Sequence, residues 1–202
     1  SSTYDFQVSA KNAAGFGASV STVTLTATGQ SDSIALSWAA NTDGITISNH
    51  IVEYRISGDS TWLQVDTLST SRATTLTGLV NGTAYEVRVA RITGTGAGAS
   101  VSSYTSAVVG TPVTTPSAPT ITANSGVGQV QLSWTAPAGN GSDIYDYVVQ
   151  YRLVGAASWA TWSDGVSTAT SAIVFGLTNG SQYEFRVAAT NAIGAGAYSI
   201  AP

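Results

Sequence analysis

The sequence predicts an all-β protein made of two tandem copies of one antiparallel domain. Apolar or alternating runs of about five to six residues, such as "VQLSW", have the length and period of strands. Turn signals such as "NTDG", "SGDS" and "TNGS" separate these runs at short intervals. Apolar residues do not recur at helical spacing over a helical length. Short strands with turns every 8–12 residues or so are typical of a sandwich or a barrel.

A repeat defines the two copies. Five landmarks recur in the same order at separations of 96 to 98 residues: Trp38 and Trp134, Tyr54 and Tyr151, Trp62 and Trp159, Leu79 and Leu177, and Tyr85 and Tyr183. The spacing drifts by only two residues, so we infer two copies of one unit of about 95 residues, which is a common domain size.

The strands are easiest to place in the second copy. A run that ends in "LSW" is followed by the long apolar run "YVVQYR", and the last strand follows the turn "TNGS", where Gly180 supplies the positive φ that the turn needs. The expected strands cover residues 119–124, 129–134, 145–153, 157–162, 171–176 and 182–190.

These motifs resemble the fibronectin type III domain. The segments that carry the resemblance are "LSW", "YRLVG", "LTNGSQYEFRVAATNAIGAGAYS" and the linker "TPSAPT", and it covers residues 23–202 almost completely. The resemblance implies tandem immunoglobulin-like antiparallel β-sandwiches. The chain has no Cys, so the disulfide-bonded immunoglobulin variants match less well.

The expected core follows from size and from the resemblance. A small sandwich needs large apolar groups at its centre, and Trp38 and Trp134 supply them. The resemblance adds a tyrosine corner, in which a Tyr hydroxyl bonds to upstream backbone, six residues after a Leu. The predicted core residues are Trp38, Tyr54, Leu79, Tyr85, Trp134, Tyr151, Leu177 and Tyr183.

The first residues repeat the end of a domain. Residues 1–19 align with the last hairpin of each copy. This gives a terminal fragment at 1–22 and domains at 23–112 and 113–202, the last with an incomplete final strand. Residues 23–28 align both with a first strand, which we favour, and with a last strand. We expect the chain to be an excerpt of a longer array of such domains. The alternative is an arm that pairs with an open sheet edge of another subunit.

The composition argues against most kinds of catalytic, metal-binding and nucleic-acid-binding site. Without Cys there are no thiolate metal sites, and His50, the only histidine, cannot build a zinc site and is expected at the surface. Asp143 and Asp146 lack the spacing of a calcium loop. Seven basic residues against eleven acidic ones give a net charge of -4, which argues against nucleic acid. No membrane span is visible. We expect no enzyme activity, no metal and no cofactor.

The remaining candidates are aromatic. Trp62, Trp159 and Trp162 are the predicted binding surface, and Trp159 and Trp162 lie three apart, so they should face opposite sides of a strand. Exposed Trp stacks on sugars or on partner proteins, although packing on the sheet is the simpler expectation.

The Lys-poor style of the sequence resembles bacterial extracellular proteins and phage tail-fibre or capsid surface proteins. The expected function is a structural or adhesive spacer outside the cell, on a cell surface or on a virion, that contacts other subunits or neighbouring domains. The alternative is an accessory spacer or glycan-binding module of a secreted carbohydrate-active enzyme.

Overall fold

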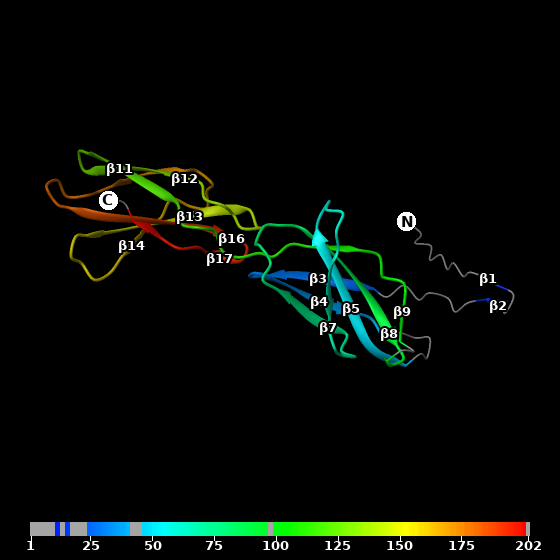
Figure 1. Cartoon of the computed structure of the whole chain (residues 1–202). Coiled ribbons are helices and arrows are strands. Elements are labelled where there is room, and N and C mark those ends of the chain that lie inside the picture. The colour runs from blue at the N-terminus through cyan, green and yellow to red at the C-terminus, as the bar shows by residue number, and fades with distance from the viewer. Residues whose placement is uncertain (1–10, 13–14, 17–23, 41–45, 97–98, 201–202) are drawn as a thin grey trace. The chain divides into compact units, whose positions relative to one another are not determined.

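The computed structural model describes residues 11–12, 15–16, 24–40, 46–96 and 99–200. Every regular element among them is a strand, and all pairings are antiparallel, so the predicted all-β class is confirmed (Figure 1). No helix long and apolar enough to cross a membrane occurs in this part of the chain. Contacts divide the chain into two compact units, with the main division between Thr111 and Pro112.

The sandwich of the first unit consists of two sheets. One is three-stranded with the order β3-β4-β7, and the other has the order β10-β8-β5-β6 with β9 also paired to β8. The strands are β3 (Leu25–Gln30), β4 (Ser33–Trp38), β5 (Ile47–Ile56), β6 (Leu63–Asp66), β7 (Ala73–Thr77), β8 (Tyr85–Thr93), β9 (Ser100–Val101) and β10 (Val108–Gly110).

The second unit repeats this plan with the orders β11-β12-β15 and β14-β13-β16-β17, and β18 also pairs with β16. Its strands are β11 (Thr120–Gly126), β12 (Gln129–Thr135), β13 (Ile144–Leu153), β14 (Ala160–Trp162), β15 (Ser171–Phe175), β16 (Tyr183–Asn191), β17 (Gly194–Ala195) and β18 (Ser199–Ile200). All six strands predicted here are present. β14 starts later than expected because its pairing with β13 begins only where Ala160 lies opposite Tyr151.

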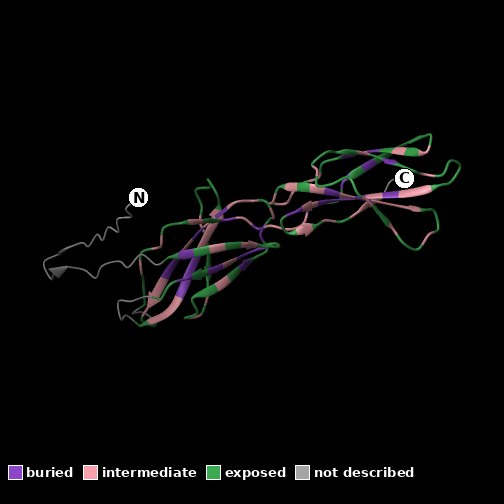
Figure 2. Cartoon of the chain, turned by 180° about the vertical axis from the view of Figure 1, so that it is seen from behind, coloured by how far each residue is buried: buried purple, intermediate pink, exposed green. Residues whose placement is uncertain are grey.

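Each unit has its own core, formed by alternate residues of the central strands. In β8, Val87 and Val89 point inward between outward-facing charged residues, as the two-residue period of a strand requires. In the second unit, Phe185 and Val187 of β16 are buried at the equivalent places. Figure 2 shows this alternation as purple bands along the strands.

The predicted core residues differ in how far their side chains are buried. Trp38 and Trp134 are each 7% exposed, and Leu79 and Tyr85 are each 6% exposed. The other four, Tyr54, Tyr151, Leu177 and Tyr183, are only partly buried and pack against the edge of the cores. The hydroxyl of Tyr183 accepts a hydrogen bond from the Thr178 N–H at 3.2 Å, which is the tyrosine-corner contact.

The segment with two candidate roles is a first strand. β3 pairs with β4 along its whole length, with Leu25 opposite Trp38, as β11 pairs with β12 with Ile121 opposite Trp134. At the start of the chain, β1 (Lys11–Asn12) pairs with β2 (Gly15–Phe16). The rest of the predicted fragment 1–22 lies outside the described residues.

The segment between the two units is built into the second one. Pro112, Pro116 and Pro119 are buried. The Thr114 N–H donates to the Asn140 carbonyl at 3.1 Å, and the Asn140 side-chain amide donates to the Thr115 carbonyl at 2.9 Å. The backbone groups of this segment are therefore partly paired with a loop of the second unit.

Asn191, at the end of β16, adds further hydrogen bonds to this segment. Its side chain is 1% exposed, and its amide donates to the carbonyls of Thr114, at 2.8 Å, and Gly139, at 2.9 Å. Its Oδ1 accepts from the N–H groups of Ile193 and Gly194. One buried side chain therefore joins the junction segment, the loop before β13 and the turn after β16.

We predict that Asn191→Ala destabilises the second unit by about 3 kcal/mol, because buried carbonyl and N–H groups would lose their partners. Urea unfolding followed through the amide signals of β13 and β16 measures this loss. Asn124→Ala, at an exposed position of β11, is the matched control and should change stability by less than about 0.5 kcal/mol. Equal effects of the two substitutions would contradict the role given to Asn191.

Candidate binding surface

The outer face of the larger sheet in each unit carries a row of charged side chains. In β5, Glu53 and Arg55 alternate with inward-facing residues, and in β8 the same holds for Glu86 and Arg88. The register places Glu53 opposite Arg88 and Arg55 opposite Glu86. Opposite charges on facing positions attract one another across the strands, so the sheet register itself forms two ion pairs.

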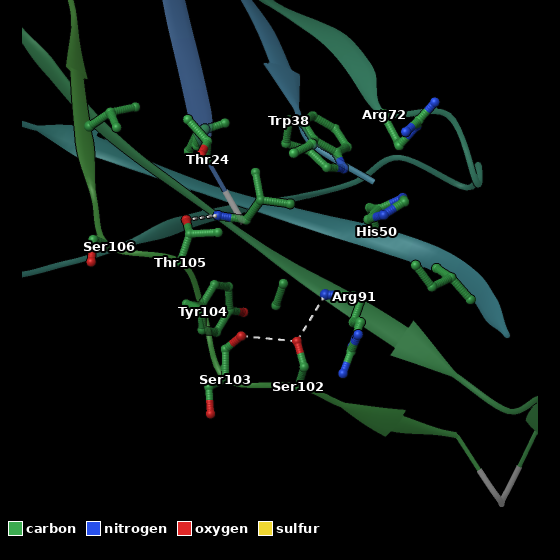
Figure 3. A pocket seen from close by; sticks show the side chains of 16 residues that line it. Thr24, Trp38, His50, Arg72, Arg91, Ser102, Ser103, Tyr104, Thr105 and Ser106 are labelled. Atoms are coloured by element: carbon green, nitrogen blue, oxygen red, sulfur yellow. Dashed lines mark hydrogen bonds between the residues drawn. The ribbon is translucent and has the colours of Figure 1, made fainter. Parts of the chain in front are cut away.

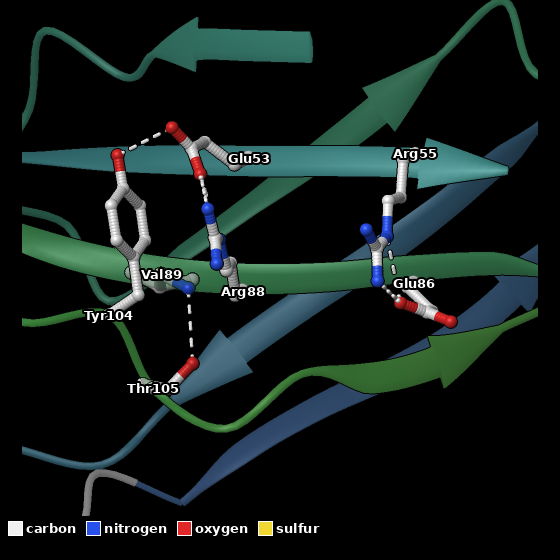
Figure 4. Close-up of polar contacts among 7 residues, drawn as sticks. All are labelled: Glu53, Arg55, Glu86, Arg88, Val89, Tyr104 and Thr105. Carbon is white, nitrogen blue, oxygen red and sulfur yellow. Dashed lines mark hydrogen bonds and ion pairs between the residues drawn. The ribbon is translucent and has the colours of Figure 1, made fainter. Parts of the chain in front are cut away.

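Both ion pairs of the first unit are close (Figure 4). An Nη2 of Arg55 lies 2.6 Å from Glu86 Oε2, and an Nη2 of Arg88 lies 2.6 Å from Glu53 Oε2. The hydrogen bond from Arg55 lowers the pKa of Glu86. The Tyr104 hydroxyl donates to Glu53 Oε1 at 2.7 Å. Burial and this bond to a carboxylate raise the pKa of Tyr104 to about 12.

Aromatic rings lie against these guanidinium groups. The guanidinium carbons of Arg55 and Arg88 lie 4.3 and 4.0 Å from the Trp62 ring centroid, and that of Arg88 lies 4.4 Å from the Tyr104 centroid. Such contacts are cation–π interactions, which attract a cation to the face of a ring. We call Tyr104, Arg88, Trp62 and Arg55 the first-unit stack.

The second unit has an equivalent arrangement, the second-unit stack of Tyr198, Arg186, Trp159 and Arg152. The guanidinium carbons of Arg152 and Arg186 each lie 4.3 Å from the Trp159 centroid, and that of Arg186 lies 4.2 Å from the Tyr198 centroid. Arg152 pairs with Glu184 at 2.5 Å. Arg186 differs, because its partner at the position of Glu53 is the neutral Gln150.

The three predicted surface tryptophans separate into two groups. Trp62 and Trp159 are half-buried members of the stacks. Trp162 packs against the core, with its ring centroid 4.5 Å from Phe175 and 6.5 Å from Tyr151. The opposite orientation of Trp159 and Trp162 agrees with their three-residue spacing.

Sequence reasoning missed the arginines of the stacks. The signal was present, because Arg152 lies 97 residues after Arg55 and Arg186 lies 98 after Arg88, which are the separations of the other landmarks. The five landmarks that define the repeat are aromatic or apolar, and the repeated arginines are not among them.

A cavity of about 480 Å³ opens at one end of the first unit (Figure 3). Trp38 and His50 line it on one side, and residues 102–106 of the segment between β9 and β10 line it on another. The indole N–H of Trp38 has no hydrogen-bond partner among the described residues, but the same holds for Trp134, so this feature is common to both units and indicates no ligand.

His50 corrects one expectation. It is 4% exposed rather than at the surface, because β5 starts at Ile47, after which a bulge leads the strand into its inward-facing register. The His50 ring meets the Trp38 ring edge-on with centroids 5.0 Å apart. Tyr147 takes this place against Trp134 in the second unit.

Burial lowers the pKa of His50, and a contact of 3.3 Å between Nδ1 and the Ser69 carbonyl opposes this only in part. The neutral ring is thus favoured in the folded state.

Asp143 precedes β13, and Asp146 lies within it. Asp146 accepts a hydrogen bond from the Ser167 N–H at 3.1 Å, and Asp143 is exposed. Within the described ranges, no group of three or more His, Cys, Asp or Glu side chains is placed to hold a metal ion.

Comparisons with known proteins identify the domain type. The family model described as the fibronectin type III domain matches residues 18–108 and 114–201. The phosphatidylinositol phosphatase PTPRQ of Homo sapiens is 32% identical over 133 residues, which are 60% of this chain and 5% of that protein. Protein turtle of Drosophila melanogaster is 34% identical over 88 residues, which are 43% of this chain and 6% of that protein.

Among solved structures, the FN1-FN3 domains of chicken CNTN1 match 87% of this chain and 63% of that one, with 18% identity and a TM-score of 0.41. The chain spans about a twentieth of the length of the curated relatives named above.

We predict that the single histidine titrates below its ordinary pKa of 6.5 in the folded chain. Between pH 7 and pH 5 the unfolded chain binds a proton at this site before the folded chain does, so the first unit loses stability as the pH falls through 6.5. The NMR signal of His50 Cε1–H gives the pKa, and urea unfolding at both pH values gives the stability.

His50→Tyr provides the matched control, since the second unit carries Tyr147 against its own Trp. This variant should keep the aromatic contact and lose the part of the pH dependence that His50 causes. A His50 pKa at or above 6.5 in the folded chain would refute the prediction.

Proposed function

The chain belongs to the fibronectin type III family, and from this premise we propose that it is a structural and adhesive module of a larger extracellular protein, at a bacterial surface or on a virion such as a phage tail fibre. Fibronectin type III domains are typically non-catalytic, structural or adhesive modules.

One observation carries the spacer role, namely that each unit has a complete core and the junction segment belongs to the second unit. A spacer must transmit force without opening between its modules. In this chain the segment from Pro112 to Pro119 is held by Asn140 and Asn191. Force on the junction would therefore act on the hydrogen bonds and packing of a folded unit.

The charge distribution supports a protein or glycan partner over nucleic acid. The chain has a net charge of -4, and nucleic-acid binding depends on clustered basic residues that neutralise phosphates. In the first-unit stack each guanidinium is already paired with a carboxylate. We therefore assign contacts with neighbouring domains or other subunits as the main interactions.

A second candidate function is favoured by the half-buried rings of Trp62 and Trp159 on the outer faces of the sheets. Aromatic rings at a surface can stack on sugars. The module would then be the accessory spacer or glycan-binding part of a secreted carbohydrate-active enzyme. Binding of neutral polysaccharides, followed by Trp fluorescence, separates this function from a purely structural one.

We predict that a chain pulled by its two ends unfolds in two separate events. Each event should release up to roughly 300 Å of length, because each unit holds close to ninety residues that extend by about 3.5 Å each. Single-molecule force spectroscopy makes this measurement. A single event, or units that extend without resisting force, would argue against a load-bearing spacer.

A further inference from the structure

We propose that Arg186, on the outer face of the second unit, binds the anionic groups of an acidic polysaccharide. This inference deepens the adhesive half of the proposed function. It comes from a comparison of two copies of one arrangement within the same chain, which differ at the partner of a single arginine.

The two stacks differ in charge. The first-unit stack has two guanidinium groups, Arg55 and Arg88, and the two carboxylates that pair with them. In the second-unit stack, Arg152 pairs with Glu184, but Arg186 donates from Nε and Nη2 to the amide oxygen of Gln150, at 2.8 and 2.6 Å. Among the described residues Arg186 has no carboxylate at ion-pair distance. The second-unit stack therefore contains one arginine, Arg186, that is paired with a neutral amide where the first-unit stack has a carboxylate.

The position of this charge is fixed. Arg186 lies against both Trp159 and Tyr198, at 4.3 and 4.2 Å from the ring centroids. Gln150 is also held, because its amide nitrogen donates to Thr161 Oγ1 at 3.1 Å. A guanidinium has five N–H donors, and only two of those of Arg186 are used in these contacts. The remaining donors suit a planar carboxylate or a sulfate, which Arg binds in a two-point contact.

The surroundings favour a polysaccharide as the source of the anion. The guanidinium of Arg186 lies beside the Tyr198 ring, and an aromatic ring can pack against a sugar face while the charge selects an acidic residue. Because the chain as a whole is acidic, with a net charge of -4, this local positive site would be specific rather than part of a broad basic patch.

The test uses the full chain and NMR at low salt. Dextran sulfate and polygalacturonate supply sulfate and carboxylate, and uncharged dextran is the control. We expect at least one acidic polymer to shift the indole N–H signal of Trp159 in a saturable manner and to leave that of Trp62 unchanged. Uncharged dextran should shift neither signal.

Two reciprocal substitutions, one in each unit, exchange the partners of Arg186 and Arg88. Gln150→Glu gives Arg186 the partner that Arg88 already has, so affinity should fall by at least about tenfold, the equivalent of one lost charged contact. Glu53→Gln gives the first unit the arrangement of the second, so a response should arise at Trp62. Neither variant removes a core residue, because both positions lie on the outer face.

The proposal is overturned if neither acidic polymer shifts Trp159, or if Gln150→Glu binds as well as the original chain. Polyglutamate that binds as tightly as the polysaccharides would also overturn it, since the site would then take acidic protein segments. The pulling experiment does not depend on these results, so the spacer role and the polysaccharide site can fail separately.

Discussion

The register between the two central strands of the larger sheet is the constraint on which both units depend. In the first unit it places Val52 opposite Val89, both buried in the core, and at the next position it places Glu53 opposite Arg88 on the outside. A shift by one residue would exchange these two faces, burying charge and exposing the core. The same register therefore determines the interior packing and the pattern of ion pairs and aromatic rings on the surface.

Much of this could be predicted from the sequence. Strand period, turn residues and the spacing of Trp38 and Trp134 were sufficient for the fold, because apolar alternation is a local signal that burial requires. The stacks were not found, because their contacts join strands that are distant in the sequence and use charged side chains. The burial of His50 was not predicted from the sequence, because a bulge changes the face of the sheet to which the following residues point.

The two units are useful as a comparison because each shows which features the sandwich needs. An aromatic ring lies against the central Trp in both, although it is His50 in one and Tyr147 in the other. An arginine pair flanks a Trp in both, but only one unit neutralises both arginines. Features kept in both copies are explained by stability, and the neutral Gln150 is a difference that stability alone does not require.

Asn191 has a further consequence for the lifetime of the chain. Junctions between domains are usually the first places that proteases cut, because they are exposed and can be drawn into an active site as an extended strand. Here the residues after Pro112 are tied to carbonyl and amide groups of a folded sandwich. Cleavage within this segment must wait until the second sandwich opens, so the junction survives in a digestive medium about as long as that domain stays closed.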